Sequence, residues 1–212
     1  MRQVFLKELQ LTKVYIIFFI FLIPFTYGMN VPITGINIWI LLSFIFLSFY
    51  SDSRNEVNRY LISVPIFRKH IVFVRYIFFF ILTSGFTLYL WLIDHLANQG
   101  LPFLGNSPLT GSSILWLFAL TCIIVSLSLP ILYYIKSFHR AMAVLMTLVF
   151  FSALFYGIIV GNPLITWDES IKHFADNLSH IQLFVSLTAL SLIFLYLSYK
   201  LSAWIFMKRD LL

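Results

Sequence analysis

The stretch "YLISVPIFRKHIVFVRY", Tyr60 to Tyr76, decides how the chain is organised. Three basic residues and a Ser-Val-Pro break separate the long apolar segments on either side of it. Upstream, Val57 begins a spacing of apolar residues that is typical of a helix, and Pro65 ends that helix because it disfavours the helical conformation of the residue before it. The pattern predicts an elbow between two helices. Pro65 and Phe67 would lie near its tip, on an apolar and basic surface that needs a partner.

Six apolar stretches surround this elbow, most of them close to the length of about 20 residues that a membrane-spanning helix needs. The chain is 61% hydrophobic and only 10% charged, whereas roughly 25% of the residues of a soluble domain are charged. The alternating pattern of membrane barrel strands is absent from the sequence. We therefore predict an all-α polytopic membrane protein with six transmembrane helices. The predicted spans are Val14 to Met29, Ile36 to Tyr50, Ile71 to Ile93, Ser112 to Ile135, Ala141 to Val160 and Ile181 to Met207.

The basic residues indicate how these spans are oriented. Of the 14 Lys and Arg residues, all but Lys172 lie before the first span, between the second and third or at the start of the third, between the fourth and fifth, or near the end of the chain. By the positive-inside rule, both termini and the elbow are predicted to be cytoplasmic. The net charge of +6 is then an orientation signal, and no nucleic-acid partner is expected. The first span is expected to be an uncleaved anchor, because no small-residue cleavage site follows it.

Two amphipathic segments are predicted to lie on the membrane surfaces of a single transmembrane domain, residues 1–212. Residues 1–13 are expected to form an inner interfacial helix, with Phe5 and Leu9 among the side chains that face lipid. A frayed start of the chain is the alternative. Residues 163–180 are expected to form a short outer helix, because apolar residues recur there at helical spacing.

Groups for catalysis or metal binding are sparse in the sequence. No zinc-protease motif, nucleophile elbow or phosphate-binding P-loop occurs, and the centres of the predicted spans contain almost no ionisable residue. We therefore expect neither an enzyme nor a chain that binds ATP itself, and a single Cys122 excludes a disulfide framework. His173, Asp176 and His180 have the spacing of metal ligands, but this is equally the spacing of the polar face of the outer helix.

The residues from Asp52 to Tyr76 resemble the loop between the second and third helices of ABC-2 type permeases, the membrane subunits of bacterial ABC exporters. From Leu61 to Tyr76 the chain matches the pattern L-x-S-x-P-x-x-R-x-x-I-V-x-x-[KR]-Y, and Asp52 supplies the acidic residue that precedes it. Six spans, an inner basic helix and an outer helix are also similar to that family. The resemblance therefore covers the whole chain, and this loop is its specific part.

The resemblance implies that residues 52–70 form a coupling elbow that contacts a separate P-loop ABC ATPase subunit. ATP and Mg²⁺ would bind to that subunit, so this chain is expected to need no cofactor. It also implies a second permease subunit, in a homodimer or a heterodimer, and a place in the bacterial plasma membrane. Contact with anionic membrane lipid is the alternative for the tip of the elbow. The residues expected to couple are Arg59, Tyr60, Ser63, Pro65, Phe67, Arg68 and Lys69.

The predicted function is that of the membrane subunit of an ATP-driven exporter that moves an amphipathic cargo, a peptide or a lipid-like antimicrobial compound, out of the cell. A conduit without buried charges suits such a cargo better than a strongly polar one, and the resemblance includes peptide-exporting members. Two other classes stay open: a membrane enzyme, and a structural or regulatory membrane partner without transport. Copurification of a P-loop ATPase would distinguish the exporter from both.

Overall fold

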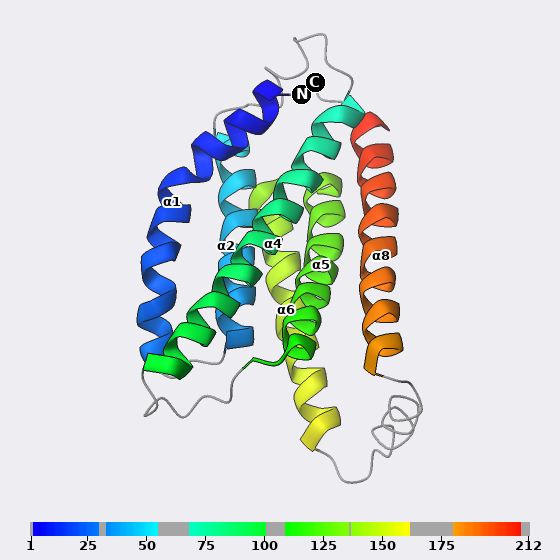
Figure 1. Cartoon of the computed structure of the whole chain (residues 1–212). Coiled ribbons are helices and arrows are strands. Elements are labelled where there is room, and N and C mark those ends of the chain that lie inside the picture. Colours follow the sequence, from blue (N-terminus) through cyan, green and yellow to red (C-terminus); the bar gives the residue numbers. More distant parts are fainter. Residues whose placement is uncertain are drawn as a thin grey trace.

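The computed structural model describes residues 2–29, 33–54, 68–100, 109–135, 137–161 and 180–208. Within these ranges every regular element is an α-helix, and the helices form a bundle (Figure 1). They are α1 (Arg2–Gly28), α2 (Ile33–Arg54), α4 (Arg68–Gly100), α5 (Gly111–Tyr134), α6 (Phe138–Gly161) and α8 (His180–Lys208).

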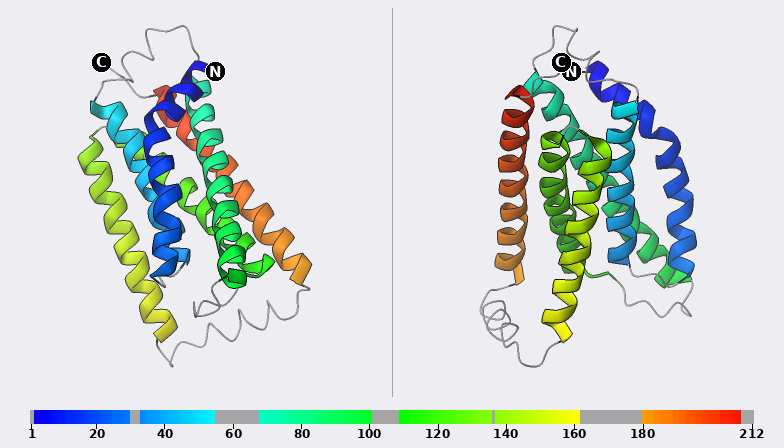
Figure 2. Two further views of the ribbon diagram at one scale, coloured as in Figure 1. Left: turned by 60° about the vertical axis from the view of Figure 1, so that its left-hand side comes forward. Right: turned by 180° about the vertical axis from the view of Figure 1, so that it is seen from behind.

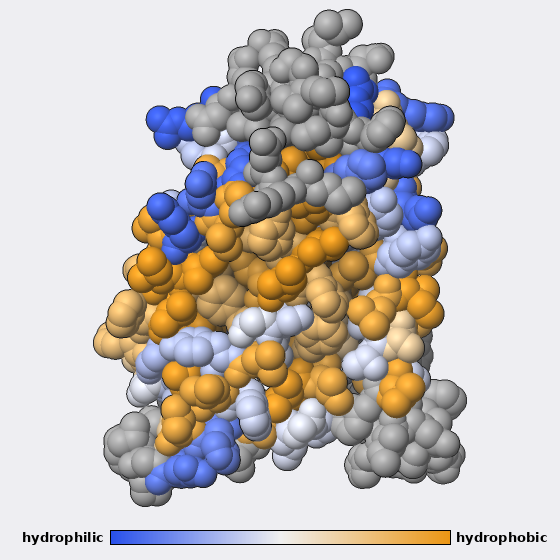
Figure 3. All heavy atoms as spheres, turned by 45° about the horizontal axis from the view of Figure 1, so that its top comes forward, coloured by the Kyte–Doolittle hydropathy of each residue, from blue (hydrophilic) through white to orange (hydrophobic). Residues whose placement is uncertain are grey.

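The described helices have the length and surface of membrane spans. Five are long and apolar enough to cross a membrane, and α6 adds a shorter apolar stretch, Phe138–Ser152. Large apolar side chains cover the outside of the bundle, such as Phe21 at 75% exposure and Trp39 at 68%, and Figure 3 shows them as a broad orange belt. Such a surface suits hydrocarbon, where a helix satisfies its own backbone hydrogen bonds. The predicted all-α polytopic class is confirmed.

One end of the bundle gathers the starts of α1 and α4 and the ends of α2 and α8 (Figures 1 and 2). We call it the termini end. The elbow predicted from the sequence connects two helix ends of this group, the end of α2 and the start of α4. Most of it, residues 55–67, lies outside the described part of the chain. The predicted outer helix also lies outside it, except that His180 begins α8.

Helix α4 occupies a central place, since it packs against α1, α2, α5 and α8. Helix α5 packs along α8, and α6 contacts α5 and α2. Within the core, the rings of Phe19, Phe44 and Phe86 join α1, α2 and α4, with centroids 5.2 to 6.5 Å apart. Through these contacts α4 positions the helices around it.

Hydroxyl groups also join the helices in the interior. The Tyr76 hydroxyl lies 2.6 Å from Ser198 Oγ and 2.8 Å from Ser202 Oγ, which links α4 to α8. Ser198 Oγ in turn donates to the backbone carbonyl of Ser126 in α5 at 2.5 Å. Because lipid tails compete equally well for apolar side chains, such polar contacts contribute specificity to helix packing inside a membrane.

At the opposite end of the bundle, Asp94 joins α1, α4 and the segment before α5. Its carboxylate accepts a hydrogen bond from the Tyr27 hydroxyl at 2.6 Å and another from the backbone N–H of Leu109 at 2.7 Å. The side chain is buried, at 2% exposure. A buried carboxylate is stable only with such partners, and it fixes the separation of the three segments.

The start of α1 differs from the sequence expectation in its contacts. Residues 2–13 continue into the span as one helix. Phe5 was expected to face lipid, but it packs against the core, with its ring centroid 5.8 Å from that of Phe78 in α4. Leu9 is 41% exposed, as expected for a side chain that faces lipid. Helical spacing in the sequence identified an amphipathic segment but not the helix that it packs against.

Candidate functional site

Two charged residues lie near the two helix ends that the predicted elbow joins, one on each helix. Asp52 lies close to the end of α2 at Arg54, and Arg75 lies about two turns after the start of α4 at Arg68. The backbone therefore brings the two side chains to the same level at the termini end of the bundle.

Arg75 is paired with two carboxylates. Its Nη2 donates to Glu8 Oε1 at 2.7 Å, and its Nε donates to the same oxygen at 3.2 Å. Nη2 also forms an ion pair with the carboxylate of Asp52. Glu8 belongs to α1, so the guanidinium joins α1, α2 and α4 by charge-assisted hydrogen bonds, which are stronger than neutral ones.

Lys7 and Ser48 complete the pairing of the two carboxylates. The ammonium of Lys7 pairs with Asp52 and lies 3.8 Å from Glu8 Oε1. Ser48 Oγ of α2 donates to Glu8 Oε2 at 2.7 Å. We call Lys7, Glu8, Asp52 and Arg75 the charge network. It contains two acids and two bases, so its formal charge is zero.

Three members of the charge network are buried. Glu8, Asp52 and Arg75 are 0%, 2% and 3% exposed, whereas the side chain of Lys7 keeps 23% of its surface. Charges that leave water incur a desolvation penalty of several kcal/mol each, which is offset only by close pairing and further hydrogen bonds. The pairing explains how these groups are tolerated inside a membrane protein, where ionisable residues are rare and usually functional.

Aromatic rings enclose the guanidinium and extend the contacts to a fourth helix. The Cζ atom of Arg75 lies 4.5 Å from the ring centroid of Phe49 in α2 and 5.9 Å from that of Tyr133 in α5. Arg75 Nη1 also lies 3.5 Å from the Tyr133 hydroxyl oxygen, which accepts its hydrogen bond. The rings add cation–π attraction and keep water away from the charges.

The network is built to hold helices together, because each of its charged groups has a partner within the described residues. Both of its carboxylates are occupied by side chains of this chain. The described ranges also contain no group of three or more His, Cys, Asp or Glu side chains placed to hold a metal ion. The metal candidate from the sequence is not placed, since His173 and Asp176 lie outside the described residues.

Of the residues predicted to couple, the structure describes Arg68 and Lys69, in the first turn of α4. Arg68 Nη1 donates to the backbone carbonyl of Met207 at 3.3 Å, which joins the start of α4 to the end of α8. Lys69 is exposed. The other predicted coupling residues lie outside the described part of the chain: Arg59, Tyr60, Ser63, Pro65 and Phe67.

Sequence reasoning missed the charge network. Arg75 was interpreted as an orientation signal and as part of a motif, and Glu8 was not selected at all. A signal existed, because Arg75 follows Ile71 in an apolar run and a buried arginine needs acidic partners. On the side of the membrane that Arg75 occupies, acidic residues are few, and Glu8 and Asp52 are among them.

The bundle of long apolar helices defines a multi-pass membrane protein. The family described as ABC-2 family transporter protein matches residues 3–207, and the chain belongs to this family. It is a membrane subunit of an ABC transporter in the cell membrane, and members of the family rely on a partner subunit for ATP hydrolysis. No curated protein and no solved structure matches the chain.

Proposed function

We propose that this chain exports an amphipathic cargo and that the charge network transmits movement of the coupling elbow to the membrane helices. The observation that carries the proposal is the contact of Arg75 with Glu8 and Asp52, which links both arms of the elbow to α1. Without such a link, a push on the elbow could be absorbed by sliding of helices whose apolar contacts compete with lipid. With it, α1, α2 and α4 move together.

The cycle begins with closure of two ATPase subunits on ATP, which displaces the elbows of two permease subunits. The displaced ends of α2 and α4 carry α1 through the charge network and α5 through the contact of Arg75 with Tyr133. The two bundles then change from inward to outward access, and hydrolysis returns them. In this scheme the second permease subunit is a copy of this chain or a related one.

An amphipathic cargo suits the interior that the structure describes. The buried charges near the termini end are paired with one another, so they are not available to a solute. In the middle of α4, the hydroxyls of Thr83, Ser84 and Thr87 donate to backbone carbonyls of their own helix. A strongly polar solute would find few groups here to replace its water shell, at a cost of several kcal/mol for each unpaired group.

The test of the cargo class is ATP hydrolysis by the permease and its ATPase, reconstituted together in proteoliposomes. Amphipathic peptides and lipophilic compounds are expected to raise the rate of hydrolysis, and a sugar or a small ion is expected to leave it unchanged. The opposite pattern would contradict the proposal. A matched control uses a scrambled peptide of equal charge that cannot present an apolar face.

We also propose that the termini end is cytoplasmic, in accordance with the distribution of basic residues. Ser53 is exposed at the end of α2, and Gln99 is exposed near the opposite end of α4. In a Cys122→Ala background, Ser53→Cys should react with a membrane-impermeant thiol reagent only after the cells are opened. Gln99→Cys should react in intact cells. Labelling of Ser53→Cys in intact cells would place the termini end outside the cell and would contradict the proposed orientation.

A further inference from the structure

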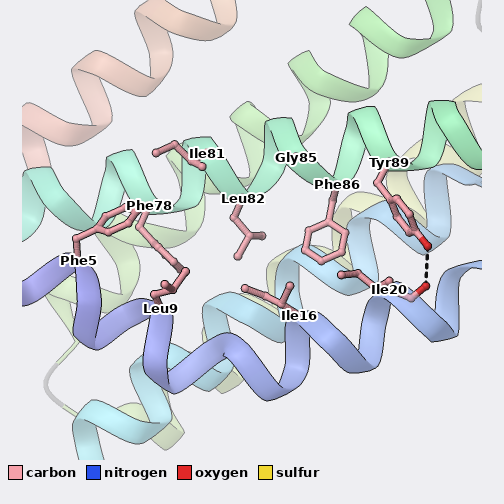
Figure 4. Close-up of a pocket in the computed structure, with 10 residues that line it drawn as sticks. All are labelled: Phe5, Leu9, Ile16, Ile20, Phe78, Ile81, Leu82, Gly85, Phe86 and Tyr89. Carbon is pink, nitrogen blue, oxygen red and sulfur yellow. Dashed lines mark hydrogen bonds between the residues drawn. The ribbon is translucent and has the colours of Figure 1, made fainter.

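A groove of about 260 Å³ lies between α1 and α4. Figure 4 shows its lining, four side chains from α1 and six residues from α4, all of them apolar except for the hydroxyl of Tyr89. Phe78, Leu82 and Phe86 are buried and form the floor, whereas the rim is open: Ile20 and Ile81 are 39% and 52% exposed. The groove therefore opens toward the lipid that surrounds the helices.

Gly85 keeps the groove open in its middle. A Cβ atom added at this residue would meet no heavy atom within 4 Å, so the missing side chain leaves space rather than permitting a close contact between backbones. Glycine inside a helix is unfavourable by roughly 0.5–1 kcal/mol relative to alanine. The close helix packing that often accounts for glycine in membrane helices is absent at this position, so the open space itself is the feature to explain.

The dimensions of the groove fit one lipid chain. From Phe78 to Tyr89 the lining follows α4 for roughly 16 Å, which is about half of the 30 Å or so of a bilayer hydrocarbon core. Tyr89 donates to the backbone carbonyl of Ile20 at 2.8 Å and closes the end of the groove that is farther from the termini end. The volume is below the roughly 300–1,000 Å³ of sites that enclose drug-sized molecules, so a whole cargo molecule fits poorly.

A cation lies on the face of α1 that lines the groove, about halfway between Phe5 and Ile20. Lys13 follows Leu9 by four residues and precedes Ile16 by three, so it shares their helical face, and its side chain is exposed. Unlike Lys7, it forms no ion pair with any acid of the described ranges. A lysine near the end of a span directs its ammonium toward the membrane interface, where it would meet a lipid phosphate.

We propose that the groove between α1 and α4 binds one acyl chain of an anionic phospholipid from the leaflet at the termini end, with the lipid phosphate at Lys13. The proposal does not depend on the direction of transport or on the cargo. Because the groove is formed by Phe5, Leu9 and other α1 residues next to Glu8, the bound lipid fills the contact between the two helices that the charge network joins.

The experiment uses the full-length chain in detergent, with dioleoyl phosphatidylglycerol and dioleoyl phosphatidylcholine as probes and native mass spectrometry as the readout. Gly85→Leu places a side chain in the groove, where its Cβ would meet no heavy atom within 4 Å. It is expected to weaken binding of the tightest phosphatidylglycerol several-fold, since the leucine takes space and packing contacts from the acyl chain. Lys13→Gln is expected to weaken phosphatidylglycerol binding roughly fivefold and to leave phosphatidylcholine binding unchanged.

The matched control is Gly28→Leu, which also enters open space but lies outside the groove. It should bind both lipids as the unmodified chain does. Equal lipid binding by Gly85→Leu and Gly28→Leu would overturn the groove site, and equal affinity for the two headgroups would overturn the role of Lys13. If Gly85→Leu abolished dimer formation but kept the lipid, the groove would belong to a second copy of the chain and the proposal would be wrong.

Discussion

Replacement of Arg75 by methionine is expected to destabilise the folded chain by about 3–5 kcal/mol, because it leaves buried charges without their partner. The guanidinium is 3% exposed and pairs with Glu8 and Asp52. Once it is removed, the two carboxylates share only Lys7, whose ammonium is 3.8 Å from Glu8 Oε1. The midpoint of thermal unfolding in detergent should fall by roughly 10 °C.

The matched control for this substitution is Arg140→Met, since Arg140 is exposed near the start of α6. Its unfolding midpoint should stay within about 1 °C of the unmodified value, because exposed charges contribute little. Arg75→Lys should give an intermediate loss, since an ammonium cannot reproduce the planar fork of donors. Equal midpoints for Arg75→Met and Arg140→Met would show that the charge network does not stabilise the bundle.

The double substitution Phe67→Ala and Arg68→Glu in the elbow is expected to reduce transport and cargo-stimulated ATP hydrolysis at least tenfold. An aromatic side chain and an arginine are typical anchors of protein interfaces, and removal of such an anchor costs about 2 kcal/mol or more. The sequence predicts both in the tip of the elbow, and neither belongs to a predicted span. The amount of the chain inserted in the membrane should therefore stay the same.

A charge reversal at the same end of the bundle but outside the elbow, Arg140→Glu, is the control for the double substitution. It should preserve both activities. Copurification of the ATPase measures the contact directly, and the double variant should retain much less of it than the control. If the double variant kept both its ATPase and its transport, the tip of the elbow would be assigned to membrane lipid instead.

The helices could be predicted from the sequence because each is a long apolar run with polar residues at its ends. The predicted span from Ile71 to Ile93 lies within α4 (Arg68–Gly100), and that from Ser112 to Ile135 coincides with α5 to within one residue at each end. The helices of the first two spans extend beyond the apolar runs, α1 back to Arg2 and α2 on to Arg54. Leu9 and Glu8 continue α1 toward its start, where charged residues interrupt the apolar pattern although the helix does not end.

The charge network could not be read from local patterns, because its members are far apart in the sequence. Glu8 and Arg75 are separated by 67 residues. The helical pattern around Glu8 does not distinguish it from an exposed polar residue of a surface helix. Likewise, Gly85 belongs to no repeating pattern in the sequence that would predict a groove beside it. The groove exists only because α1 packs beside α4, and that packing brings together residues that are far apart in the sequence.

The claim that the charge network couples the elbow to the membrane helices is tested most directly by the triple variant Glu8→Leu, Asp52→Leu and Arg75→Met. Replacing the buried members of an ion network together by apolar groups often leaves stability unchanged. The fourth member, Lys7, is 23% exposed and can keep its ammonium in water, so the variant should fold and should copurify with the ATPase. The hydrogen bonds of Tyr27 with Asp94 and of Tyr89 with Ile20 would still join α1 to α4, but both lie away from the termini end. Among the described contacts at the termini end, apolar ones would remain between α1 and the helix ends that the elbow joins, and these compete with lipid. We expect cargo to stimulate ATP hydrolysis by the unmodified complex and not by the complex with the triple variant. Stimulation equal to that of the unmodified complex would contradict the coupling role.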